Sequence, residues 1–149
     1  MISETQPRLA RVRILCAAPA YLDRRGMPQT PTDLSGHEHI ASGNLEPREL
    51  VNLQGETALL EPASMTCRTI LDDGDAQREA TLAGAGLSMN SPWNVAGEIA
   101  MGLLVRVLPE WKMNDRSVLW QIYPRTNVLT PKTRVFMDFL NAKLGSRSE

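Results

Sequence analysis

Residues 65–93 read MTCRTILDDGDAQREATLAGAGLSMNSPW, and this stretch decides the fold class. It begins with a run typical of a β-strand, which stops at a short acidic segment. From Ala76 onward, small and apolar residues recur at spacings of three and four, as they do on one face of an α-helix. Gly84 and Gly86 end that helix, and a short apolar strand over residues 87–89 follows at once. Strand, helix and strand in this order predict an α/β architecture with a mainly parallel sheet.

The same alternation continues on both sides of this stretch. Upstream, residues 12–17 predict a strand that leads into a helix beginning at Pro19, because the fixed φ of proline suits the first helical position. Downstream, Ser91 and Pro92 begin another helix by the same logic. Residues 49–60 predict a β-hairpin. Two further strands are expected over residues 103–108 and 118–123.

The last element is an amphipathic helix over residues 131–144. Thr130 is its expected cap, and Pro131 its first residue. Its apolar stripe consists of Phe136, Phe139, Leu140 and Leu144. An apolar stripe must pack against something, either its own sheet or another chain.

The bulk composition is that of an ordinary globular domain. The chain has 149 residues, 42% hydrophobic and 22% charged, which is enough for one domain. Its formal net charge is -1, so it lacks the basic excess of a domain that binds nucleic acid by electrostatics. Prolines and arginines interrupt residues 1–15, so no signal peptide is indicated, and no apolar run approaches the roughly 20 residues of a membrane helix. We expect a cytoplasmic protein.

The side chains that could carry chemistry do not form a recognisable catalytic or metal motif. Cys16 and Cys67 lie in apolar or strand-like runs, which favours reduced, buried thiols. His37 and His39 have no third ligand at a metal-binding spacing, and we expect solvated or capping histidines. A calcium loop counted from Asp73 would need a glutamate where Gly84 stands. The sequence predicts no enzyme, no cofactor and no metal.

Several segments, each weak alone, together resemble the C-terminal part of LysR-type transcriptional regulators. They cover roughly residues 11–142 in the family's order. The segments are Cys16 to Leu22, Pro31 to His37, Asp73-Gly74 with Ala80 to Leu87, Pro92-Trp93, Gly102 to Val105, Leu108 to Trp111, Tyr123-Pro124, and Leu129 to Lys132 with Arg134 to Leu140. The organisation expected from this resemblance is a tail or linker remnant over residues 1–10, a partial effector-binding domain over 11–144 and a flexible end over 145–149.

The resemblance implies a periplasmic-binding-protein-like fold of type 2, of which this chain would supply most of the second lobe and the C-terminal helix. The family's winged helix-turn-helix, linker helix and first lobe have no counterpart in the sequence. The implied function is ligand sensing, with a small-molecule effector coupled to the arrangement of an oligomer. A cleft needs two walls, so we expect the isolated chain to bind an effector weakly. The apolar stripe of the last helix predicts a homodimer or higher homo-oligomer. The alternative is a free-standing interaction protein that associates with full-length regulators.

Ligands of open α/β sheets bind at the carboxyl ends of strands, near helix N-termini. Three places in the sequence fit this rule, and the resemblance sets all three beside the cleft between the lobes. The candidate effector-binding residues are Ala18, Pro19, Asp72, Asp73, Gly74, Ser91 and Pro92. The acidic run 72–75 departs from what an anionic effector would need. Its carboxylates either cap the helix or receive an effector that is not a simple carboxylate.

Overall fold

The computed structural model describes residues 6–10, 12–43, 45–113, 118–121 and 130–145. The chain divides into two compact units, a larger one over Val12–Asp115 and a smaller one that joins Met1–Arg11 to Arg116–Glu149. Each unit is described by itself.

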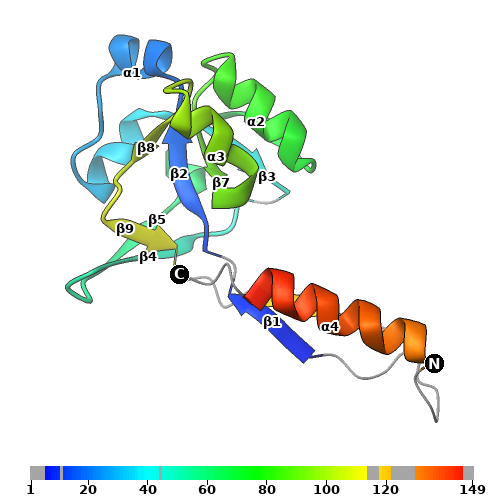
Figure 1. The fold of residues 1–149 in the computed structure, drawn as a ribbon. Helices are drawn as coiled ribbons and strands as arrows, with labels where there is room; N and C mark the ends of the chain where they lie inside the picture. Colours follow the sequence, from blue (N-terminus) through cyan, green and yellow to red (C-terminus); the bar gives the residue numbers. More distant parts are fainter. Residues whose placement is uncertain (1–5, 11, 44, 114–117, 122–129, 146–149) are drawn as a thin grey trace. The chain divides into compact units, whose positions relative to one another are not determined.

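The larger unit alternates strands and helices (Figure 1). Its strands are β2 (Ile14–Ala17), β3 (Glu38–Ser42), β4 (Arg48–Asn52), β5 (Thr57–Leu60), β6 (Thr66–Leu71), β7 (Leu87–Asn90), β8 (Val105–Val107) and β9 (Trp111–Met113). Its helices are α1 (Pro19–Arg25), α2 (Gly74–Leu82) and α3 (Pro92–Ala100), with 3-10 turns η1 (Pro31–Gly36) and η2 (Pro62–Ser64). The predicted hairpin is confirmed, with β4 and β5 paired antiparallel.

Five strands form the main sheet, in the order β6-β3-β7-β2-β8. β3 pairs parallel with both β6 and β7, whereas β2 pairs antiparallel with β7 and β8. β6, β3, β7 and β8 therefore run in one direction and β2 alone is reversed. The predicted α/β fold with a mostly parallel sheet is confirmed, and the reversal of β2 is the exception to it.

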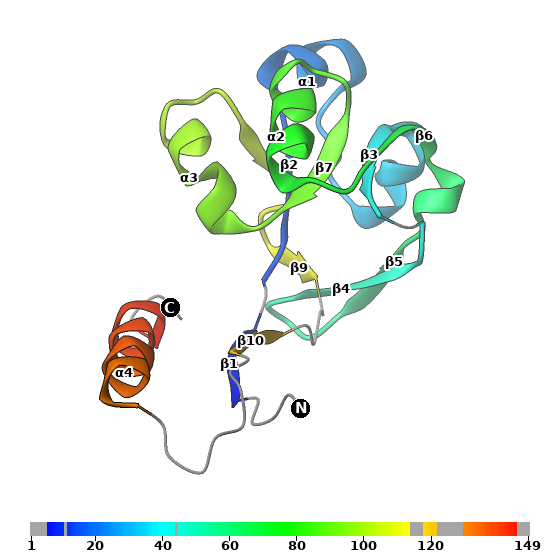
Figure 2. The same ribbon diagram turned by 90° about the vertical axis from the view of Figure 1, so that its right-hand side faces the viewer.

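The two faces of the sheet carry separate apolar clusters, because successive side chains of a strand point to opposite faces. On β2, Leu15 and Ala17 join the larger cluster, in which residues from α1, η1 and the β5-β4-β9 sheet are buried. Ile14 and Cys16 join the smaller cluster, with Val95 of α3. Helices α2 and α3 lie beside one another over this second face (Figure 2).

One glycine is required by a close approach between backbones. A Cβ built on Gly86, just before β7, would lie 2.6 Å from the carbonyl oxygen of Glu38. Real Cβ atoms do not come this close to an oxygen, so any side chain there would push β7 away from β3. The glycines between α2 and β7 thus both end the helix and let the next strand into the sheet.

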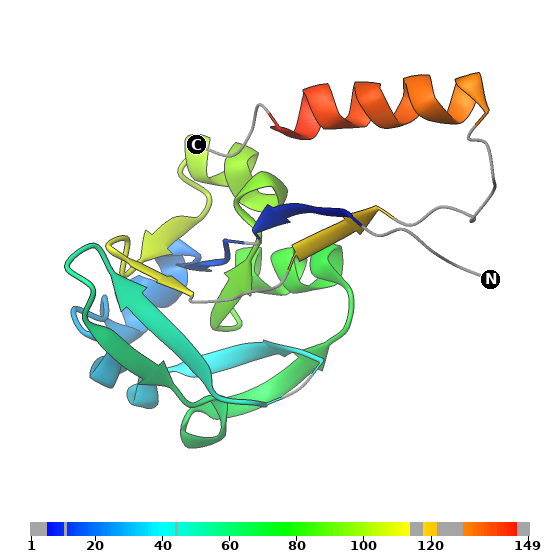
Figure 3. The same cartoon turned by 90° about the horizontal axis from the view of Figure 1, so that it is seen from below.

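The smaller unit contains a two-stranded ribbon and one helix. β1 (Gln6–Ala10) pairs antiparallel with β10 (Val118–Gln121), and α4 (Pro131–Gly145) contacts β1 (Figure 3). Thr130 caps α4 as predicted, since its Oγ1 accepts a hydrogen bond from the Thr133 backbone N–H at 3.3 Å.

A tail or linker was expected over residues 1–10, and within that range Gln6–Ala10 form a strand. Its partner β10 lies more than one hundred residues away, so the local sequence does not indicate the pairing. The domain expected over residues 11–144 spans parts of both compact units, whose division falls between Asp115 and Arg116, and its bounds stay a prediction. The predicted flexible end at residues 145–149 lies outside the described residues except for Gly145, the last residue of α4.

Candidate functional site

The carboxyl ends of β6, β3 and β7 meet at one edge of the main sheet, which we call the carboxyl edge. α2 begins there after β6, and α3 begins there after β7. The two helix starts are tied together, because Asn94 Nδ2 donates a hydrogen bond to the Gly74 carbonyl at 3.1 Å. Arg78 Nη1 adds bonds to the Asn94 backbone and side-chain oxygens at 3.4 and 3.3 Å. The structure therefore brings together two of the three predicted places, the Asp72-to-Gly74 segment and Ser91-Pro92.

Two carboxylates of the acidic run at this edge interact with groups of α2. Asp73 Oδ2 accepts a hydrogen bond from the Ala76 backbone N–H at 2.9 Å, which makes it the cap of α2. Asp75 Oδ1 lies 3.2 Å from Nη1 of Arg78. Asp72 is exposed, and its Oδ1 lies beside Gly43. Helix capping, one of the two readings left open, is thus what Asp73 does.

Ser91 behaves differently at the start of α3. It occupies the cap position, but its side chain makes no cap hydrogen bond, and Pro92 follows as the first helical residue. Ser91 is half-buried and Pro92 is exposed. The Ser91 hydroxyl is therefore not used to stabilise the helix start.

Ala18 and Pro19 lie at the opposite end of the sheet from the other candidates. The reversal of β2 places its last residue, Ala17, beside Val105, whereas its first, Ile14, lies beside Asn90 at the carboxyl edge. Ala18-Pro19 thus follow the carboxyl end of their own strand, as expected, but at the opposite end of the sheet from the other two places. The start of β2, and with it Arg13, takes their place at the carboxyl edge.

At the end where Ala18 lies, a hydrogen-bond cluster around Tyr21 ties α1 to β3. The Tyr21 hydroxyl donates to Glu38 Oε2 at 2.7 Å, accepts from the Glu38 backbone N–H at 2.9 Å and lies 3.0 Å from His37 Nδ1. Burial, followed by the hydrogen bond to the Glu38 side chain, raises the pKa of Tyr21 to about 12. Burial is also the main cause that lowers the pKa of His37. The Glu38 carboxylate also lies 3.2 Å from Arg25 Nε, so the cluster joins α1 to the start of β3 by hydrogen bonds and an ion pair.

Both histidines are buried, so neither is solvated, although His37 does occupy the C-cap position of η1. His37 is 6% exposed and His39 is 5% exposed. His39 is buried because the strand order puts β3 between β6 and β7 in the interior of the sheet. Burial lowers the pKa of His39, and a hydrogen bond with the Leu87 backbone opposes this only in part.

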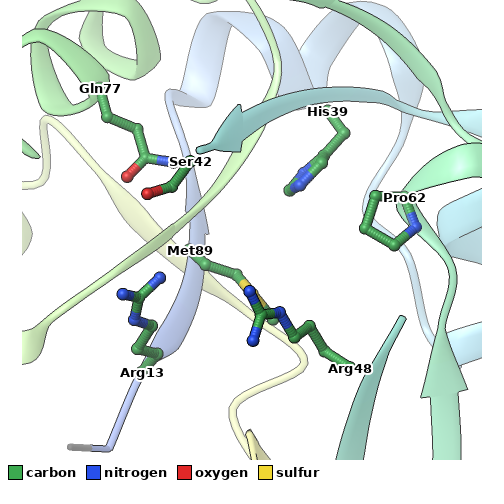
Figure 4. Close-up of a pocket in the computed structure, with 7 residues that line it drawn as sticks. All are labelled: Arg13, His39, Ser42, Arg48, Pro62, Gln77 and Met89. Atoms are coloured by element: carbon green, nitrogen blue, oxygen red, sulfur yellow. The ribbon is translucent and has the colours of Figure 1, made fainter. Parts of the chain in front are cut away.

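A small polar cavity opens between the main sheet and β4 (Figure 4). Its volume is about 20 Å³. It is lined by Arg13, His39, Ser42, Arg48, Pro62, Gln77 and Met89. Ser42 is the last residue of β3 and Gln77 lies in the first turns of α2, so the cavity lies next to the carboxyl edge. Sequence analysis missed it, because Arg13 and Arg48 belong to no motif and are far apart in the chain.

Cys16 lies within a buried polar cluster on the α2 face of the sheet. Asn90 Nδ2 donates to Cys16 Sγ at 3.3 Å and to Ser88 Oγ at 2.6 Å, and Thr81 Oγ1 lies 2.6 Å from Ser88 Oγ. Burial raises the pKa of the Cys16 thiol above its ordinary value. Cys16 is buried, as expected, and it is not in a disulfide bond. A buried, protonated thiol is a poor nucleophile. The side chain of Cys67 lies outside the described residues.

Comparison with known proteins shows which family the chain belongs to. The family model for the LysR substrate binding domain matches residues 4–145. The chain belongs to the LysR substrate binding domain family. Curated relatives that this chain resembles are named as transcriptional regulators.

Two curated relatives show how far the likeness extends. The transcriptional activator TtdR of Escherichia coli strain 536 is 29% identical over 130 residues, covering 87% of this chain and 41% of TtdR. The transcriptional regulator CrgA of Neisseria meningitidis serogroup C is 28% identical over 140 residues, covering 92% of this chain and 45% of CrgA. The LysR-type chain thus spans less than half the length of these relatives.

Solved structures agree on the fold. The regulatory domain of AphB from Vibrio vulnificus superposes with a TM-score of 0.74 at 28% identity, covering 93% of this chain and 68% of that one. The regulatory domain of CrgA from Neisseria meningitidis superposes with a TM-score of 0.76 at 25% identity, covering 95% and 69%. The predicted resemblance to LysR-type regulators and the predicted periplasmic-binding-protein-like fold are confirmed.

Among the residues that the structure describes, none of the helices combines the length and the apolar character that a membrane span needs. No group of three or more histidine, cysteine, aspartate or glutamate side chains among the described residues is placed to hold a metal ion.

The predicted apolar stripe of α4 is partly open to solvent. Phe136 is 60% exposed and Phe139 is 54% exposed, while Leu140 is half-buried. The side chain of Leu144 lies outside the described residues. Within its own unit, α4 thus leaves two aromatic side chains without a full packing partner.

Proposed function

We propose that this chain is the ligand-sensing part of a LysR-type transcription factor, in which a small-molecule effector binds at the carboxyl edge of the main sheet. The observation that supports this most directly is the pair of helix starts, α2 and α3, held side by side by Asn94 at the place where ligands of α/β sheets bind. Helix N-termini present backbone N–H groups to such a ligand. Asp72 to Gly74 and Ser91-Pro92 are the proposed effector contacts, while Ala18-Pro19 are not part of this edge.

Sensing requires that the effector favours one of two arrangements of the regulator. A ligand shifts such an equilibrium only through its different affinity for the two states. We propose that closing a second wall over the carboxyl edge supplies that difference and biases the subunits of an oligomer, as allosteric coupling requires. With one wall alone, binding of the effector by this chain is expected to be weak.

A titration followed by amide NMR tests this proposal. A panel of small metabolites is added to the isotope-labelled chain, and the residues whose signals move are mapped. We expect at least one metabolite to shift signals confined to the carboxyl edge, and a Ser91→Trp variant, which blocks this edge, to lose the response. Ala20→Trp is the matched control, because Ala20 is exposed on α1 at the other end of the sheet. A panel that moves no signal at this edge, or that moves signals around Ala18, contradicts the proposal.

We further propose that the exposed aromatic side chains of α4 contribute to self-association, as a homodimer or a higher homo-oligomer. Phe136 and Phe139 lie one turn apart on the helix, so they form one apolar surface. Burying large aromatic side chains contributes strongly to association. Nothing in this surface favours a foreign regulator over a second copy of the chain, so the alternative function as an interaction protein gains no separate support.

Light scattering at several protein concentrations measures this association. We expect an oligomer that Phe139→Asp dissociates and that Arg134→Asp leaves intact, because Arg134 is exposed on the opposite face of the same helix. A folded monomer at every concentration would contradict the proposed self-association and leave effector binding at the carboxyl edge untouched.

A further inference from the structure

The polar cavity beside the carboxyl edge combines positive charge with enclosure. Two of its seven lining residues are arginines, which stay charged at any physiological pH, and none of the seven is acidic. Arg13 precedes β2 and Arg48 begins β4, so two separate sheets deliver the charges to one place. Figure 4 shows both guanidinium groups directed toward the same space. Guanidinium groups match the geometry of carboxylate and phosphoryl oxygens, so such a pair of side chains fits an oxyanion.

A second observation points to a missing occupant. His39 is 5% exposed, and its Nδ1 has no hydrogen-bond partner among the described residues. Figure 4 shows the ring nitrogens directed into the cavity, with Ser42 and Gln77 on the far side. Buried polar atoms are nearly always paired in native proteins, so an orphaned nitrogen in a lined cavity indicates a ligand or an ordered water.

The size of the cavity decides how much of a ligand it could hold. A volume of about 20 Å³ admits roughly one water-sized group. Only the end of a larger molecule would enter, and the rest would extend along the carboxyl edge. Arg13 and Arg48 also interact with other groups of the chain, so an oxyanion would share them with those groups.

The acidic run cannot serve as the anion receiver. Asp73 caps α2 and Asp75 pairs with Arg78, which leaves negative charge at the start of that helix. The acidic side chains would repel an anionic effector from this helix start. Arg13 and Arg48 in the neighbouring cavity would attract it. The conflict between an acidic helix start and an anionic ligand therefore disappears if the charged end of the ligand lies in the cavity.

We propose that the cavity of Arg13, Arg48, His39 and Ser42 is the subsite that receives the oxyanion end of the effector, a carboxylate or a phosphoryl group. The two arginines neutralise its charge, and the Ser42 hydroxyl donates to it. The neutral Nδ1 of His39 accepts a hydrogen bond from a hydroxyl group that the ligand itself carries next to its oxyanion. This subsite rests on the proposed function, because it names the chemical class of the ligand sensed at the carboxyl edge.

Small anions test the subsite without knowledge of the effector. Amide NMR of the chain is followed during titration with sodium acetate, with sodium phosphate and with sodium chloride at equal ionic strength. We expect saturable shifts at Ser42 and Gln77 with acetate or phosphate that chloride does not reproduce. Saturation by acetate alone identifies a carboxylate ligand, and saturation by phosphate alone identifies a phosphoryl ligand. Both results support the oxyanion subsite.

Substitutions then show which side chains are responsible. Arg13→Gln and Arg48→Gln should each lower the affinity for the anion at least tenfold, whereas Arg68→Gln should change this affinity by less than twofold. Arg68 is exposed on β6 and does not line the cavity, so it controls for the loss of one positive charge. Should an arginine variant fail to fold, Ser42→Asp provides the second test, because it places a carboxylate inside the cavity and should abolish anion binding in a folded protein.

The result separates the subsite from the proposed function. No saturable binding to the folded chain, an equal response to chloride, or full binding by both arginine variants would overturn the subsite. If metabolites still move the carboxyl edge in that case, effector sensing stands and only its charged end has been misplaced. If acetate or phosphate binds but no metabolite reaches the edge, sensing itself has failed.

Discussion

Helices α2 and α3 begin at the same edge of one sheet and have nine residues each, yet their first turns differ in polarity and in capping. The cap of α2 is Asp73, whose carboxylate bonds to the helix, whereas the cap position of α3 holds Ser91, whose hydroxyl does not. Four residues further on, α2 buries the polar Gln77 and α3 buries the apolar Val95. A common position in the fold has thus been given two different tasks.

The neighbours of each helix explain the difference. Gln77 Nε2 donates to the Ile40 carbonyl at 3.0 Å, at the place where the pairing of β3 with β6 changes register. An irregular ladder leaves backbone groups that need a side-chain partner. Val95 instead lies in the apolar cluster with Ile14 and Cys16. At this position α2 is therefore held to the sheet by a side-chain hydrogen bond, whereas α3 packs among apolar side chains.

The largest effect is expected from giving α3 the residue of α2. Val95→Gln would place an amide in an apolar cluster with no partner, and would add volume to a site that is 0% exposed. Both changes act in one direction, and we expect a loss of about 3 kcal/mol in the free energy of unfolding. Chemical denaturation measures it. Ala96→Gln, on the exposed neighbour, should cost less than about 0.5 kcal/mol. A tolerated Val95→Gln would show that the two positions are interchangeable.

The reverse exchange should cost less, because it removes one hydrogen bond and little volume. In Gln77→Val the Ile40 carbonyl loses its side-chain donor, and we expect a loss of about 2 kcal/mol. Urea denaturation of the variant beside Glu79→Val, an exposed position on the same helix, measures the difference. Equal stability of the two variants would mean that the bond to Ile40 contributes nothing, and that the polarity of Gln77 serves the cavity alone.

The cap of α2 gives the third effect. Asp73→Ala should lower the free energy of unfolding by about 1 kcal/mol, because the Ala76 N–H loses its acceptor. Asp73→Ser should restore most of it, since serine is also a good cap. Asp75→Ala serves as the control for loss of an exposed charge from the same run, and it should cost less than about 0.5 kcal/mol. Equal losses in Asp73→Ala and Asp75→Ala would assign the effect to charge and not to capping.

The local pattern of the sequence was sufficient to predict most helices and strands of the larger unit and the helix α4 of the smaller one. Helix starts at Pro19, Pro92 and Pro131 follow from proline geometry and from the residue before each, and all three are observed. The helix α2 and the strand β7 follow from spacing and from the glycines between them. These features depend on residues that are close together in the chain.

What failed depends on contacts between distant residues. Nothing in residues 12–17 indicates that β2 runs antiparallel to β7. Successive side chains of a strand alternate between the two faces of the sheet in the same way whichever direction the strand runs. Because β2 is reversed, Ala18-Pro19 lie at the end of the sheet opposite to the carboxyl edge. The burial of His39 and the convergence of Arg13 with Arg48 follow from strand order, which local patterns do not carry.

The smallest effect on stability, and the sharpest on function, is expected at Ser91. Because its hydroxyl makes no cap bond, Ser91→Ala should change the free energy of unfolding by less than about 0.5 kcal/mol, in contrast to Asp73→Ala. If the hydroxyl contacts the effector, its loss should weaken binding about fivefold, the worth of one ordinary hydrogen bond. Parallel denaturation curves and NMR titrations measure both quantities, with Ser35→Ala, an exposed serine of η1, as the control. If Ser91→Ala loses stability and keeps its affinity for the effector, Ser91 is a helix cap like Asp73 and not an effector contact. The two helix starts would then have the same role.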